Sequence, residues 1–137
     1  MNEQDSQGSS DIYWGLLRAQ GLAILAVVLM VSVIRGPADL LLAGWGGAIS
    51  LIAYAWAGFQ LWMHPGNREP ARQTGAPIRA EVGKVVVILA LFGWTFSQWP
   101  DVGESSALII LAGAFLWTYL CGLVWLHWWT TREPQDR

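Results

Sequence analysis

Charged side chains are scarce in this 137-residue chain, and their scarcity excludes an ordinary soluble domain. Asp, Glu, Lys and Arg together make up 13% of the residues, whereas soluble domains carry about 25%. Too few polar side chains remain to cover a globule in water. The net charge of −2 also argues against binding to nucleic acid, which requires a basic face. The sequence therefore indicates a membrane protein whose surroundings are the lipid bilayer.

Residues that build catalytic and metal sites are equally few. Cys121 is the single cysteine and lies in an apolar stretch, where a thiol is most often an inert packing residue. His64 and His127 each stand alone near the end of an apolar stretch, without the clustered ligands that a metal site needs. The sequence has neither a phosphate-binding glycine loop nor a nucleophile paired with a histidine. We therefore expect no enzyme activity, no cofactor and no metal site.

Four stretches are long and apolar enough to cross a bilayer. A crossing needs about 20 mainly apolar residues, and it must be helical because lipid offers no partner for backbone N–H and C=O groups. The third stretch is marginal, because its uncharged part, residues 85–100, is too short to cross alone. That helix must therefore include charged residues at its start. The expected spans are residues 12–34, 40–63, 78–99 and 105–129.

These spans predict an all-α membrane protein of four transmembrane helices arranged as two helical hairpins. The transmembrane domain would cover residues 12–130, with a flexible polar tail at residues 1–11 and a polar C-terminal tail at residues 131–137. The start is acidic rather than basic, which argues against a cleaved signal peptide. Gly and Pro, which interrupt helices, occur in all three expected connections: residues 35–39, 64–77 and 100–104.

Basic residues concentrate at one end of this arrangement. Four spans place both termini and the 64–77 loop on the same side, whereas the other side carries Arg35. Membrane proteins have an excess of Lys and Arg on their cytoplasmic side, so we expect both termini to be cytoplasmic. The basic residues at or near this side are Arg18, Arg68, Arg72, Arg79, Lys84, Arg132 and Arg137.

The second span is rich in small residues spaced four apart. Residues at this spacing return to the same helix face and let neighbouring backbones approach closely. We expect this face to pack on another helix of the same chain, and packing on a different membrane protein is the alternative. The residues concerned are Ala43, Gly44, Gly46, Gly47, Ala48 and Ser50.

Glu81 and Lys84 lie three residues apart at the start of the third span, with Arg79 close by, so the first two share a helix face. An ionisable residue inside a span is costly, and by default it faces protein or water and has a function. Two interpretations stay open. The pair forms an internal ion pair with Lys84 reaching back to the headgroups, or it contributes to a partner contact or an ion path.

The order of these features resembles ATP synthase subunit I, a small four-helix membrane protein encoded with bacterial rotary ATP synthases. The resemblance covers about residues 17–126. Glu81 and Lys84 at the start of the third span are its most specific element. Supporting features are the Arg18-Ala19-Gln20 sequence of the first span and the Gly46-Gly47 pair of the second.

The sequence departs from the pattern of this family in two places. Ala53 and Tyr54 stand where many relatives have Pro and Asn, and Ala80 stands where relatives often have Gly. The first departure removes a proline that kinks helices, so a bend of the second span is not expected here. It also removes a polar amide.

The resemblance implies an accessory function in a bacterial inner membrane. Members of the family are regarded as helpers that assemble or stabilise the ring of membrane c subunits, and a separate proposal makes them magnesium or calcium carriers or channels. We favour the first function, because a divalent-cation path needs several oxygen ligands at membrane depth and Glu81 is the single acidic residue there.

A homo-oligomer could still bring several copies of Glu81 together in a ring. Glu81 would then be a metal ligand, but only if the protein transports magnesium or calcium. We expect the partner contact with the c subunits to involve the polar residues Glu81, Lys84, Arg79, Arg18 and Gln20.

Overall fold

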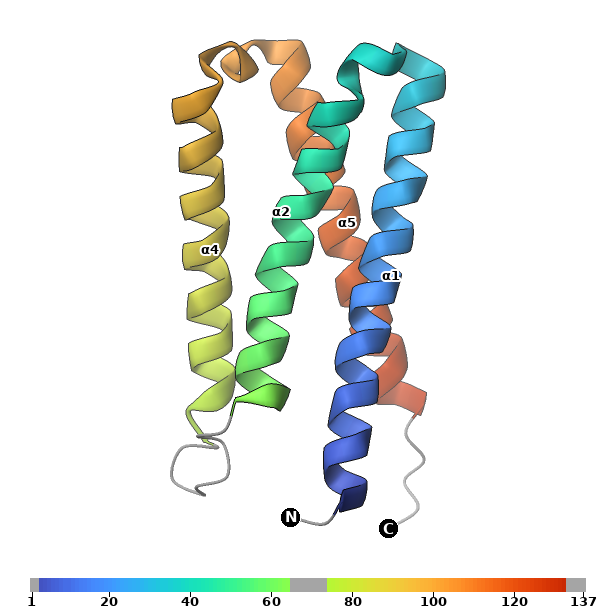
Figure 1. The fold of residues 1–137 in the computed structure, drawn as a ribbon, viewed down its shortest axis with the longest axis vertical. Helices are drawn as coiled ribbons and strands as arrows, with labels where there is room; N and C mark the ends of the chain where they lie inside the picture. The colour runs from blue at the N-terminus through green and yellow to red at the C-terminus, as the bar shows by residue number, and fades with distance from the viewer. Residues whose placement is uncertain (1–2, 65–73, 133–137) are drawn as a thin grey trace.

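The computed structural model describes residues 3–64 and 74–132, and four long helices dominate it (Figure 1). These helices are α1 (Glu3–Arg35), α2 (Leu40–Gly58), α4 (Ala76–Gln98) and α5 (Ser105–Arg132). Each is long and apolar enough to cross a membrane, which confirms the predicted four-span, all-α fold. Three short segments complete the described chain: the 3-10 helices η1 (Pro37–Asp39) and η4 (Pro100–Gly103), and the π-helical turn η2 (Phe59–Met63).

The helix boundaries correct the sequence analysis at both ends. α1 begins at Glu3, so residues 3–11, which we expected to form a flexible tail, are its first turns. Extending an existing helix adds backbone hydrogen bonds without a new nucleation step, and the polar segment therefore continues the apolar helix. α5 runs to Arg132, beyond the predicted end at residue 129, and residues 133–137 lie outside the described chain.

The second and third spans agree more closely with the prediction. α2 and η2 together cover residues 40–63 without a break, and α2 stays helical at Ala53. Most of the predicted 64–77 loop lies outside the described residues. α4 then begins at Ala76 with Pro77 in its first turn, where the missing N–H of proline removes no helical hydrogen bond.

Helix α2 lies at the centre of the bundle. In Figure 1 it runs between α1 and α4, with α5 behind it, and α1 begins at the same end of the bundle at which α5 ends. α5 and α1 pack closely on α2 and on each other, whereas α4 packs mainly on α2 and η2. α1 and α2 therefore form a packed hairpin, whereas α4 and α5, which follow each other in the chain, are held together mainly through α2.

Two glycines allow the other helices to approach α2 closely. A Cβ atom at Gly46 would collide with the backbone oxygen of Leu111 on α5, and one at Gly47 would lie 2.7 Å from the Ile24 side chain on α1. Ala43 and Ser50, from the same small-residue set, are fully buried. The small-residue face is thus shared between two helices of the same chain.

Gly46→Ala tests how closely α2 and α5 pack. Because the new methyl group would meet rigid backbone at Leu111, we expect it to lower the free energy of unfolding in detergent by about 1–3 kcal/mol. Gly44→Ala is the matched control, since its Cβ would meet only the Val28 side chain at an ordinary 3.8 Å. Equal stability of the two variants would contradict this packing.

Candidate functional site

The candidate site lies in the first turns of α4, where two small residues bring the helix close to α2. Ala80 is completely buried, and a Cβ atom at Gly83 would collide with the indole nitrogen of Trp56 on α2. This close approach places the next residue of the chain, Lys84, between α4 and the interior of the bundle, where its side chain is only 5% exposed.

Glu81 and Lys84 form an ion pair whose two side chains differ greatly in exposure. The ammonium Nζ of Lys84 lies 2.8 Å from Oε2 of Glu81 and 2.9 Å from its Oε1. The side chain of Glu81 is 65% exposed, in contrast to the buried lysine. The pair therefore reaches from the interior of the bundle to its outer surface and presents the carboxylate there.

Two tyrosine rings receive the buried ammonium. Nζ of Lys84 is 5.1 Å from the ring centroid of Tyr54 on α2 and 5.4 Å from that of Tyr119 on α5. Aromatic faces attract a cation electrostatically, and more strongly where water is excluded. The Tyr54 hydroxyl donates a hydrogen bond to the backbone oxygen of Tyr119 at 3.1 Å, which ties the Tyr54 ring to α5. Lys84 thus points into the bundle, between the rings of two other helices.

A second polar group lies on the other side of Tyr54. Gln20 of α1 is completely buried, and its Oε1 accepts a hydrogen bond from the Ser50 hydroxyl of α2 at 3.2 Å. Its Nε2 has no hydrogen-bond partner among the described residues. A Cβ atom at Gly122 of α5 would collide with this nitrogen and lie 3.0 Å from the Tyr54 ring, so glycine provides the space for both side chains.

The structure therefore joins some of the residues predicted from the sequence and separates others. Gln20 and Ser50 meet across two helices, and Glu81 meets Lys84. Arg18 and Arg79 are exposed and are not part of the buried cluster.

Sequence reasoning missed the two tyrosines and Gly122. The signal for Tyr54 was present, because it stands at a departure from the family pattern. Nothing in the sequence indicated Tyr119 or Gly122, since isolated aromatic residues and glycines are common in membrane spans.

No family model matches this chain, and neither do the curated proteins or the solved structures. The resemblance to ATP synthase subunit I therefore stays a prediction that rests on the residues themselves.

Among residues 3–64 and 74–132, no three His, Cys, Asp or Glu side chains are grouped so that they could hold a metal ion. The site presents a carboxylate on the exposed surface of α4, next to a buried ammonium that lies over two tyrosine rings.

A double-mutant cycle tests the ion pair. Glu81→Leu leaves the buried ammonium without its counter-charge, so we expect it to lower the free energy of unfolding in detergent by about 1–3 kcal/mol. This loss is below that for fully buried pairs because Glu81 is largely exposed. Adding Lys84→Met should restore most of the loss, since an apolar chain of similar length suits the site between the tyrosine rings. Additive effects of the two changes would contradict the coupling.

Proposed function

We propose that this chain is an accessory membrane protein of a bacterial rotary ATP synthase that binds c subunits and assists the assembly or stability of their ring. The observation that carries the proposal is the exposed carboxylate of Glu81, held on the outer surface of α4 by the buried Lys84. The resemblance of the Glu81–Lys84 pair and its surroundings to ATP synthase subunit I supplies the identity of the partner.

The surface around Glu81 suits a transmembrane partner. The neighbouring residues Ile78, Val82 and Val85 are 69%, 59% and 51% exposed, so the carboxylate stands on an otherwise apolar helix face. Apolar contact alone does not drive helix association in lipid, where close packing and interhelical hydrogen bonds do. A fixed acceptor near the end of a span therefore gives a partner helix an orienting polar contact.

Lys84 also bears on the alternative function, the transport of magnesium or calcium. Its ammonium lies 2.8 Å from the carboxylate of Glu81 and neutralises the charge of that carboxylate. A divalent cation would therefore have to displace the ammonium of Lys84, which is part of the chain itself. No observation on the described residues favours transport.

Copurification of the tagged protein with c subunits from native membranes tests the partner contact. We expect Glu81→Leu/Lys84→Met to fold and insert normally but to recover about tenfold less c subunit, the effect of losing one good polar contact. Glu104→Gln, which removes an exposed acidic residue at the opposite end of the bundle, is the matched control and should recover the normal amount. Normal recovery with the double variant would leave the pair as a purely structural feature of α4.

Ion flux into liposomes separates the two functions. An assembly factor should give no magnesium or calcium flux above that of protein-free vesicles. Protein-dependent flux that Glu81→Gln abolishes would instead establish the transport alternative.

We further propose that the protein resides in a bacterial inner membrane with both termini in the cytoplasm. Figure 1 places the two ends of the described chain at the same end of the bundle, and this end carries most of the basic residues of the described chain. Reporter fusions after Arg137 and within residues 65–73 should therefore read as cytoplasmic, and a fusion at Asp101 as periplasmic. A periplasmic reading at Arg137 would invert the proposed orientation.

A further inference from the structure

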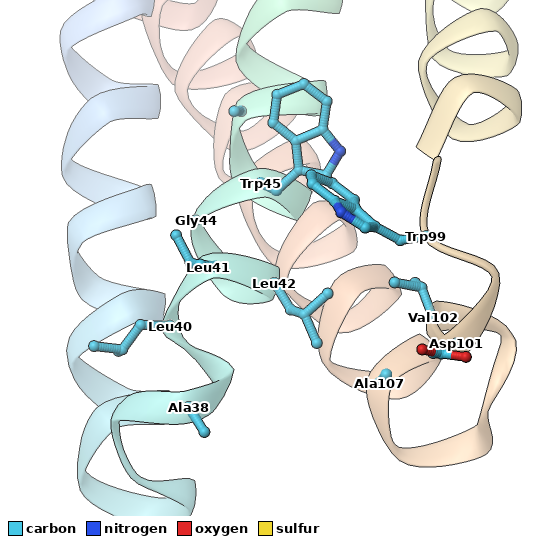
Figure 2. Close-up of a pocket in the computed structure, with 11 residues that line it drawn as sticks. Ala38, Leu40, Leu41, Leu42, Gly44, Trp45, Trp99, Asp101, Val102 and Ala107 are labelled. Atoms are coloured by element: carbon cyan, nitrogen blue, oxygen red, sulfur yellow. The ribbon is translucent and has the colours of Figure 1, made fainter. Parts of the chain in front are cut away.

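An apolar groove lies at the end of the bundle opposite the start of α1 and the end of α5 (Figure 2). Its walls come from η1, the first half of α2, the segment around η4 and the first turn of α5. The groove has a volume of about 620 Å³, within the range of sites that hold small molecules. It is far in sequence and in space from Glu81, so the proposed function makes no use of it.

Most of the groove is lined by aliphatic and small side chains. Leu41 and Leu42 of α2 face it together with Val102 of η4, and Leu41 is 86% exposed. Gly44 and Ala48, the members of the small-residue set that lie half-buried, leave it wide along α2. An open groove with such walls in a transmembrane bundle accommodates an alkyl chain, because any polar ligand group would lose its hydrogen bonds to water there.

One side of the groove has a different chemistry, because a carboxylate and two indole rings are among the groups that line it. Asp101 is exposed, and Figure 2 shows its carboxylate beside Val102, on the segment that also carries Trp99. The rings of Trp99 and Trp45 stand edge to face with centroids 6.4 Å apart. The indole N–H of Trp45 donates to the Thr95 hydroxyl at 2.7 Å, which fixes that ring.

The charges at this end favour a cation over an anion. Arg35 is the basic residue of this end, and its guanidinium is already bound to Asp39 at 3.3 Å. Asp101 and Glu104 add negative charge beside the groove. Indole faces and a carboxylate together bind an ammonium group, and an anionic headgroup would be repelled.

We propose that this groove binds one acyl chain of a phospholipid whose headgroup carries an ammonium group, with the ammonium between Asp101 and the indole of Trp99. The apolar walls along α2 take the chain, and the acidic, aromatic side of the groove selects the headgroup. The proposal does not depend on binding to c subunits.

Native mass spectrometry of the full-length protein in detergent tests this lipid site. The delipidated protein is titrated separately with phosphatidylethanolamine, which carries the ammonium, and with phosphatidylglycerol, which is anionic and lacks it. We expect one phosphatidylethanolamine to bind about tenfold more tightly than phosphatidylglycerol. Asp101→Asn should abolish this preference, whereas Glu104→Gln, an exposed acidic neighbour outside the groove lining, should retain it.

A second variant tests the groove itself. Ala48→Leu places a larger side chain against the apolar wall, so it should weaken the first bound molecule of both lipids by severalfold without lowering the melting temperature. Equal affinity of the unmodified protein for the two lipids would overturn the proposal, as would equal losses in Asp101→Asn and Glu104→Gln. A dimer that Ala48→Leu dissociates would also overturn it and would show that a second copy of the chain occupies the groove.

Discussion

The close contact between α2 and the other helices is the constraint on which the rest of this structure depends. Lipid tails are as apolar as leucine, so burial of apolar surface does not hold helices together in a membrane, and short backbone distances must do so instead. Gly46 and Gly47 allow those distances toward α5 and α1, and Gly83 allows them toward α4. Each contact involves α2, which therefore sets the positions of the other three helices.

The same close packing determines what a charge at membrane depth can do. Because α4 lies tightly on α2, the side chain of Lys84 cannot avoid the interior, and the rings of Tyr54 and Tyr119 receive its ammonium there. The side chain of Glu81, the other member of the ion pair, stays exposed at the surface of the bundle. The sequence gives no reason to distinguish the two charged residues, but in the structure Lys84 is buried and Glu81 is exposed. The two residues therefore have different roles in the proposed function.

The two ends of the bundle carry distinct chemistry. The end at which α1 begins and α5 ends carries Arg79, Arg132 and the Glu81 surface, while the other end combines a groove, an exposed Asp101 and a cluster of indole rings. Trp45 belongs to both the packing and the groove, because its ring lines the cavity while its N–H is bonded to Thr95 of α4. A partner helix and a lipid could therefore bind the protein at the same time without competing for residues.

The sequence by itself determined the number of helices and most of their boundaries, because uncharged stretches of sufficient length have one stable form in lipid. It also singled out Glu81 and Lys84, since charges inside a span are rare. It could not determine which residues surround Lys84, because Tyr54 and Tyr119 lie on other helices and look like ordinary aromatic residues. Three features arise only when the helices pack together: the unequal burial of the ion pair, the need for a residue without a side chain at position 122, and the groove at Asp101. Contacts between distant segments depend on the distances and rotations of whole helices, which no local pattern encodes.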